Sequence, residues 1–282
     1  MERFYLIAPA LLLFAAMVAA LVVYCGLYAV GRPPRLKAVK HNQLLGPFIA
    51  GYLVWLLSPL ERVLIGRVSP NFITAVSLAF CAATGFAAAF GHLAWAVWLY
   101  VAGGVLDILD GRIARFAGKQ TKSGALFDSV SDRWGELFVF LGYAWYLHQT
   151  PWLLAAFGAF GASMMVSYTR ARAEGLAISL SGGLMQRAER IVLVTGGTLI
   201  AAWYGEPSAA SILGSTMLIC TLASSATAVN RWVVGFRELK EIEAREVAPP
   251  VVVEEPAVMP VPATLKSLSN PELPRVRPLE QH

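Results

Sequence analysis

The sequence predicts an all-α polytopic membrane protein: a six-helix transmembrane bundle, an interfacial helix before it, and one extra N-terminal transmembrane helix. Hydrophobic residues make up 57% of the chain and charged residues only 15%, whereas soluble domains carry about 25% charged residues. Several apolar runs reach the roughly 20 residues that a bilayer-spanning helix needs. Lys and Arg gather at one end of these runs, as expected for the cytoplasmic side.

The first apolar run covers residues 4–30 and is followed by the basic segment from Arg32 to Lys40. It is longer than the roughly 7 to 15 apolar residues of a signal peptide. We therefore interpret it as a retained transmembrane helix whose C-terminal end lies in the cytoplasm. The pair Pro33-Pro34 stops the helix, and residues 1–40 form this helix and its basic linker.

The second apolar run, residues 44–60, is short and is bracketed by Pro47 and Pro59. If it crossed the bilayer, one basic cluster would be left on the outer side, against the positive-inside rule. We therefore predict an interfacial helix within residues 41–66.

Six transmembrane helices are predicted between residues 71 and 233, with Asn71 as a candidate N-cap of the first. Of the 23 Lys and Arg residues, all except Arg3 then lie on the cytoplasmic side or at that interface. This asymmetry predicts an integral protein of the cell membrane whose functional face is cytoplasmic. The expected helices cover residues 72–90, 93–116, 123–147, 151–172, 185–204 and 208–232.

From Lys240 on, the sequence is rich in Pro, Glu and Val and has no helical period, and residues 236–282 are assigned to this C-terminal segment. We expect a disordered cytoplasmic tail. The three cysteines lie far apart, which argues against a disulfide framework or a zinc site. The sparse and scattered charges do not suggest a nucleic-acid partner.

Four aspartates occur as pairs at i,i+3 and i,i+4, so each pair shares one face of its helix. Carboxylates in membrane-like sequence are costly and usually mark a functional site. A ligand set of carboxylates alone favours a hard ion, Mg²⁺ or Mn²⁺, and two such ions would suit phosphoryl displacement. The residues alone also allow a membrane transporter of cations or lipids that uses the aspartates as an ion site. The four aspartates are Asp107, Asp110, Asp128 and Asp132.

The spacing D-x₂-D-G-x₂-A-R-x₈-G-x₃-D-x₃-D over residues 107–132 resembles the signature of the CDP-alcohol phosphotransferase family. The resemblance covers residues 44–233 and implies an interfacial helix, six transmembrane helices and a homodimer. It implies two metal ions held by Asp107, Asp110 and Asp128, with Asp128 bridging. Asp132 would join the second metal and act as the general base. The CDP-lipid pocket would also be shaped by Gly111, Ala114, Arg115 and Gly124.

Two further segments, SYTRARAEG from Ser167 and GLMQRAERIV from Gly183, place several arginines near helix ends. They resemble the SYxKARAEG and GGxxERxER stretches of prokaryotic phosphatidylinositol phosphate synthases. Arg170, Gln186 and Ala188 depart from those stretches, where Lys, Glu and Pro stand. Simple positive-inside anchoring is the alternative for each arginine. The resemblance implies that the phosphate of an acceptor is held by Ser167, Arg170, Arg172, Arg187 and Arg190.

Together these features predict transfer of a phosphatidyl group from CDP-diacylglycerol to a phosphorylated polar alcohol, with release of CMP. Inositol 1-phosphate is the favoured acceptor, and glycerol 3-phosphate is the nearest alternative because it is also anionic. A catalytically silent scaffold is disfavoured, since none of the four aspartates is lost.

Overall fold

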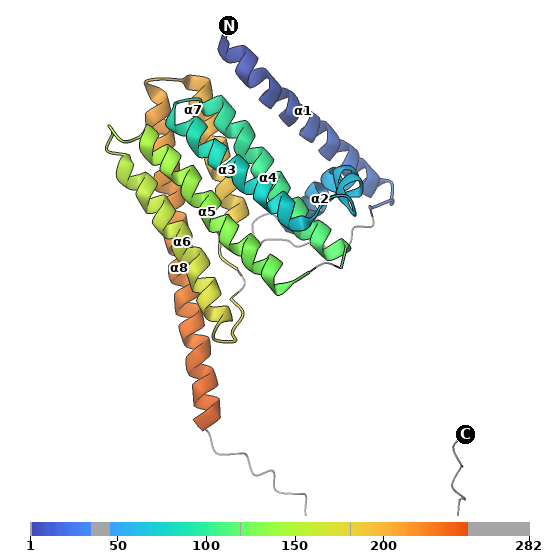
Figure 1. Ribbon diagram of the computed structural model, residues 1–282, viewed down its shortest axis with the longest axis vertical. Helices are drawn as coiled ribbons and strands as arrows, with labels where there is room; N and C mark the ends of the chain where they lie inside the picture. Colours follow the sequence, from blue (N-terminus) through green and yellow to red (C-terminus); the bar gives the residue numbers. More distant parts are fainter. Residues whose placement is uncertain (1, 35–45, 119, 181, 248–282) are drawn as a thin grey trace, which may run out of the picture. The chain divides into compact units, whose positions relative to one another are not determined.

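The computed structural model describes residues 2–34, 46–118, 120–180 and 182–247 (Figure 1). These residues form eight α-helices and contain no strand, which confirms the all-α fold class. The basic linker at 35–40 and the tail from 248 onward lie outside the described residues. The helices are α1 (Glu2–Ala29), α2 (Gly46–Leu64), α3 (Pro70–Ala89), α4 (Leu93–Phe116), α5 (Lys122–Tyr146), α6 (Leu153–Glu174), α7 (Arg187–Tyr204) and α8 (Ser208–Val247).

Five of the described helices, α1, α2, α3, α4 and α8, are long and apolar enough to cross a membrane. The other three helices, α5, α6 and α7, are not among these candidate spans, and each carries charged side chains. Length and apolarity also fit a span for α2, so its placement along the interface stays a prediction. Helix α8 continues to Val247, beyond the expected end near residue 232 and into the segment expected to be disordered.

The start of α3 differs from the sequence prediction. The Ser69 hydroxyl caps the helix by accepting a hydrogen bond of 3.3 Å from the Phe72 amide, and Pro70 follows at the first helical turn. Proline favours that position because its missing N–H would be unpaired there anyway. The prediction that Asn71 is the N-cap is therefore wrong. At α5, Thr121 is the N-cap and accepts from the Gly124 amide at 3.0 Å.

Helix α3 packs against both α4 and α5 (Figure 1). Gly85 of α3 and Gly142 of α5 meet at the second contact: a Cβ on either glycine would overlap the backbone of the other helix. Small residues allow two helix backbones to approach this closely. The crossing therefore fixes α5, which carries Asp128 and Asp132, against α3.

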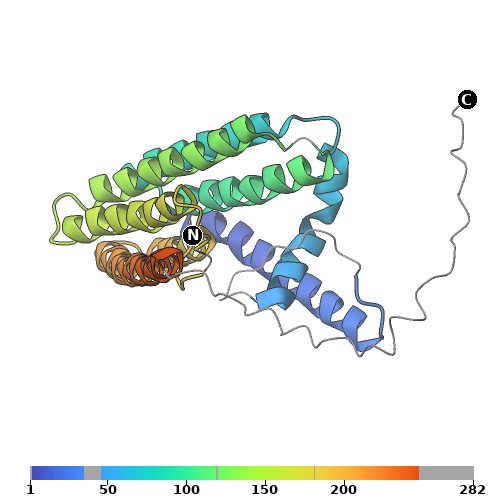
Figure 2. The ribbon, with the colours of Figure 1, turned by 90° about the horizontal axis from the view of Figure 1, so that it is seen from below.

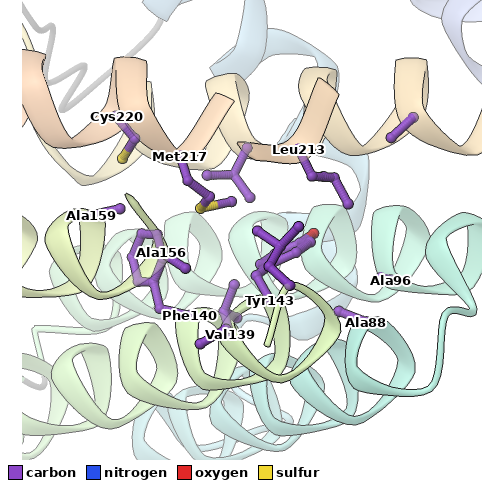
Figure 3. Packing of buried hydrophobic residues seen from close by; sticks show 14 of the residues in the cluster. Ala88, Ala96, Val139, Phe140, Tyr143, Ala156, Ala159, Leu213, Met217 and Cys220 are labelled. Atoms are coloured by element: carbon purple, nitrogen blue, oxygen red, sulfur yellow. The ribbon is translucent and has the colours of Figure 1, made fainter. Parts of the chain in front are cut away.

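Buried apolar side chains from α3 to α8 form the main core, part of which is shown in Figure 3. Tyr143 lies at its centre and is fully buried. Its hydroxyl is 2.6 Å from the hydroxyl of Thr198 in α7, so its polar end has a partner. The Thr198 hydroxyl in turn donates to the Val194 carbonyl within its own helix. A buried polar group without such a partner would cost free energy.

The N-terminal helix is attached to α2, which lies across it in Figure 2. The ring of Tyr24 is buried and contacts the rings of Tyr52 and Trp55 at centroid distances of 5.7 and 5.5 Å. The Tyr52 hydroxyl donates to the Met17 carbonyl at 2.5 Å. Aromatic contacts of this kind are worth about 0.5–1.5 kcal/mol each beyond burial.

A buried ion pair joins α2 to α4. Arg112 donates from Nε to Glu61 Oε2 at 2.9 Å and from Nη2 to Glu61 Oε1 at 3.3 Å. Both side chains are about 5% exposed. Arg112 directly follows Gly111, so the pair ties α2 to the end of α4 that carries the aspartates.

Candidate active site

Three of the four predicted aspartates converge. Asp107 and Asp110 come from α4 and Asp128 from α5, and one carboxylate oxygen from each lies within 4.8 Å of the others. Asp110 is buried, whereas Asp107 and Asp128 are half-buried. The i,i+3 spacing in α4 and the packing of both helices on α3 produce this arrangement.

A residue not singled out in the sequence orients Asp110. The Thr74 hydroxyl of α3 donates to Asp110 Oδ2 at 2.6 Å, and the Gly111 amide donates to Asp110 Oδ1 at 2.5 Å. Thr74 is itself buried. Both oxygens of this carboxylate are therefore fixed by neighbours from two helices.

Arg187, at the start of α7, pairs with Asp107 and also with Asp132, whose Oδ1 is 2.5 Å from Nη1. Asp132 makes a second ion pair with Arg133 at 3.2 Å. Asp132 is thus linked to the aspartate cluster through Arg187, although it is not one of the three converging carboxylates. Arg187, which was predicted to bind the phosphate of the acceptor, is therefore in direct contact with two of the aspartates.

Two cavities meet at the aspartates. The smaller, about 300 Å³, is lined by all four residues expected to shape the CDP-lipid pocket. The larger, about 420 Å³, contains four of the five residues expected to hold the acceptor phosphate. Asp110, Gly111, Arg115 and Asp128 line both. The smaller cavity holds Gly111, Ala114, Arg115 and Gly124, and the larger holds Ser167, Arg170, Arg187 and Arg190.

The glycines of the smaller cavity have a steric role. A Cβ on Gly111 would lie 3.3 Å from Arg115 Nη1, and one on Gly124 would lie 2.9 Å from the capping oxygen of Thr121. Both contacts are tighter than a real Cβ normally makes. Glycine at these positions therefore leaves room for the Arg115 guanidinium and for the α5 cap.

Two of the arginines that line these cavities have a buried Nε donor. Among the described residues, Nε of Arg115 and Nε of Arg187 are buried and have no hydrogen-bond partner. Buried polar groups are normally paired, and guanidinium donors match phosphate oxygens well. These two atoms favour anionic ligands.

The remaining arginines are placed differently from one another. Arg190 lines the larger cavity but is almost fully buried, where it pairs with Glu136 of α5 and donates to the Met185 carbonyl at 3.1 Å. Arg172 does not line this cavity: it faces a groove between α6 and α8. The sequence reasoning missed Arg231 of α8, which lines the larger cavity and donates to the carbonyls of Val166 and Gly182.

The three converging carboxylates fit a hard divalent cation. They offer only oxygen ligands, and like charges held this close need a compensating positive charge. Arg187 supplies one such charge from the side of the larger cavity.

An all-helical membrane fold with carboxylates on two neighbouring helices, flanked by two arginine-containing cavities, marks a functional site suited to anionic ligands. The profile of the CDP-alcohol phosphatidyltransferase family matches residues 67–236. This match covers more than half of the chain, so the chain belongs to that family and is a transferase. The membership decides against the transporter alternative.

Several characterised proteins are similar to the chain. A phosphatidylinositol phosphate synthase from Mycobacteroides abscessus is 33% identical over 148 residues, 50% of this chain and 64% of that protein. The match thus spans slightly less than two thirds of that relative's length. An archaetidylinositol phosphate synthase from Methanothermobacter thermautotrophicus is 30% identical over 172 residues, 60% of this chain and 82% of that protein.

Crystal structures of the Mycobacterium tuberculosis phosphatidylinositol phosphate synthase share the fold. The structure with CDP-DAG bound has a TM-score of 0.57 and 26% identity, covering 64% of this chain and 94% of that one. The structure in complex with manganese and citrate has the same TM-score and identity, covering 63% and 88%.

Proposed function

We propose that this protein transfers a phosphatidyl group from CDP-diacylglycerol to inositol 1-phosphate, releasing CMP and forming phosphatidylinositol phosphate. The observation that carries this proposal is the meeting of two cavities at one carboxylate cluster. One cavity has the small residues and the arginine suited to a diphosphate, and the other has arginines suited to a second anionic substrate. Relatives named for this product support the choice of acceptor.

The smaller cavity would hold the CDP moiety. Gly111 and Gly124 leave room for the Arg115 guanidinium and for the α5 cap beside the ligand, and Arg115 would offset the diphosphate charge. Asp107, Asp110 and Asp128 would hold two divalent ions, Mg²⁺ or Mn²⁺, with Asp132 completing the second site. Bound there, the ions would supply charge neutralisation at the diphosphate.

The larger cavity would hold the acceptor. Its phosphate would lie among Arg170, Arg187 and Arg231, with Ser167 beside them. Arg190 would support this site by holding the start of α7 through Glu136 and the Met185 carbonyl.

Asp132 is the base in this proposal because it borders the acceptor cavity and is connected through Arg187 to the aspartate cluster. It accepts the proton of the acceptor hydroxyl. The hydroxyl oxygen forms a bond to the β-phosphorus, and the bond from that phosphorus to the bridging oxygen of the diphosphate breaks. CMP leaves with the bonding electrons, and Arg115 balances part of its charge.

The site would face the cytoplasm, because the basic residues lie at the same helix ends as the aspartates. Residues 1–40 would form an accessory segment, residues 41–235 the catalytic membrane domain and residues 236–282 a tail. A homodimer is the expected assembly.

The test is CMP release by the purified protein with CDP-diacylglycerol, Mg²⁺ and one acceptor at a time: inositol 1-phosphate, glycerol 3-phosphate, serine or free inositol. We expect release with inositol 1-phosphate alone. Release with glycerol 3-phosphate instead would reassign the acceptor, and no release with any acceptor would contradict the proposal.

A further inference from the structure

A groove of about 780 Å³ lies between α6 and α8, and apolar side chains dominate its walls. The α6 wall is formed by residues three or four positions apart, which therefore share one helix face. The α8 wall has the same periodicity. The α6 residues are Gly158, Ala162, Met165, Thr169 and Arg172; those of α8 include Thr221, Ser225, Ala228, Trp232, Phe236 and Leu239.

The groove is narrow where Gly158 meets Thr221, and larger residues line it further along both helices. Gly158 and Thr221 form the narrow end, where a Cβ on the glycine would lie 2.9 Å from Thr221 Cγ2. Thr221 also donates to the Ala155 carbonyl of α6 at 3.0 Å. Toward Arg172, Tyr168 and Trp232 border the groove, and both are more than 60% exposed.

Arg172 adds a positive charge beside these aromatic residues. Its side chain is exposed, and within the described part of the chain it has no salt-bridge partner. The neighbouring Arg170 is paired with Glu174 at 2.9 Å. Arg231 is buried and already donates to two backbone carbonyls, at 2.8 and 2.9 Å.

We propose that this groove binds an anionic phospholipid of the surrounding bilayer, with its acyl chain along α6 and α8 and its phosphate at Arg172. The groove follows two helices that are expected to cross the membrane, where lipid hydrocarbon is the available occupant. Tyr and Trp favour the headgroup level of a bilayer, and arginine pairs well with phosphate. From Gly158 through Met165 to Tyr168 and Arg172, the groove passes from small and apolar residues to an aromatic ring and a positive charge, which is the order of groups in a phospholipid; beyond Arg172 it continues over Leu176, Phe236 and Leu239.

The site is separate from the catalytic cavities. Arg231 lines both the groove and the larger cavity. Its hydrogen bonds to the carbonyls of Val166 and Gly182 fix its side chain between the two. The proposal therefore does not depend on the proposed function, and lipid binding is measurable without turnover.

Trp232 provides the probe. The full-length protein is placed in phosphatidylcholine nanodiscs that contain a low fraction of either dibrominated phosphatidylglycerol or dibrominated phosphatidylcholine, because bromine quenches nearby tryptophan. Comparison with a Trp232→Phe variant isolates the emission of this residue from that of the other tryptophans. We expect stronger quenching by the brominated anionic lipid than by the brominated zwitterionic lipid.

Two variants and two matched controls locate the site. Ser225→Phe fills the groove, and Arg172→Gln removes its charge. Each variant should lower the apparent affinity for the brominated anionic lipid about tenfold, as expected for a blocked cavity or for one lost charged contact. The Ser225→Phe variant keeps Trp232 and adds no charge. Leu222→Phe and Arg237→Gln lie on exposed positions of α8 outside the groove, and both should behave like the unmodified protein.

Three results would overturn the proposal. Equal quenching by the two brominated lipids would remove the anionic preference. An equal loss of quenching by the anionic lipid in a groove variant and in its control would show that the lipid does not bind in the groove. Much stronger displacement of the brominated lipid by CDP-diacylglycerol than by an equimolar amount of unbrominated phosphatidylglycerol would assign the groove to the substrate. CMP release from the same preparation shows separately whether the proposed function holds.

Discussion

At the scale of single residues, Asp132 has two ion-pair partners, Arg187 and Arg133, and borders the larger cavity. Its proposed role as base differs from the roles of the three converging aspartates. An amide at this position keeps the shape of the side chain but cannot accept the proton. We therefore expect Asp132→Asn to lower CMP release by about 10²- to 10⁴-fold, the usual contribution of a general base.

Binding of CDP-diacylglycerol should survive this change, because Arg115, Gly111 and Gly124 of the smaller cavity are untouched. Equilibrium binding of labelled CDP-diacylglycerol is the measurement. If Asp132→Asn lost binding together with turnover, Asp132 would be needed to hold the nucleotide site and its assignment as base would fail.

Arg187 is the residue best placed to connect the acceptor to the aspartates. Arg187→Ala should raise KM for the acceptor about tenfold or more, since hydrogen bonds to charged groups are worth about 1.5–3 kcal/mol. Steady-state kinetics with varied acceptor test this, and Arg62→Ala, an exposed position of α2, is the control. An unchanged KM for the acceptor would favour the alternative that Arg187 only anchors the helix end.

The arginines also show what the sequence could and could not predict. Helical spacing correctly predicted which residues share a face. The i,i+4 pair Asp128 and Asp132 lines the larger cavity, and so does the i,i+3 pair Arg187 and Arg190. Arg170 and Arg172 are two positions apart, which places them on different helix faces, and only Arg170 lines that cavity. Thr74 and Arg231 come from α3 and α8, so only tertiary packing reveals them.

At the scale of elements, the α3–α5 crossing depends on glycine. Gly142→Ala would place a methyl group against the Gly85 backbone, and overpacking of this kind costs about 1–3 kcal/mol. Gly161→Ala in α6 is the matched control, since nothing lies within 4 Å of its Cβ position. It should be neutral or stabilising by about 0.5–1 kcal/mol, because alanine favours helix more than glycine does.

Thermal unfolding in detergent measures both glycine variants. A lower Tm for Gly142→Ala with an equal or higher Tm for Gly161→Ala is the expected pattern. Equal shifts in the two variants would show that the crossing is not as close as described.

The ion pair between α2 and α4 is a second element-scale feature. Glu61→Gln removes the carboxylate charge from the buried ion pair with Arg112, and breaking a buried pair typically costs about 3–5 kcal/mol. Because Arg112 adjoins Gly111, CMP release should fall as well. Unchanged Tm and activity would show that α2 is not needed to hold this end of α4.

At the scale of the whole molecule, the apolar runs and the distribution of basic residues were sufficient to predict an all-helical membrane protein. Boundaries were less predictable. The C-terminal part of α8, from Lys240 to Val247, consists mostly of charged residues, so it does not resemble the apolar runs that marked the other helices. The attachment of α1 to α2 through the buried Tyr24 was also not foreseen, since aromatic side chains in an apolar run carry no information about their partners.

The central claim is that two substrates meet at one carboxylate cluster and that the acceptor attacks the β-phosphorus. Mass spectrometry of all products from one incubation with CDP-diacylglycerol, inositol 1-phosphate and Mg²⁺ tests it most directly. The expected products are CMP and phosphatidylinositol phosphate in equal amounts. Phosphatidic acid together with a cytidylylated acceptor would show attack at the other phosphorus and would contradict the claim.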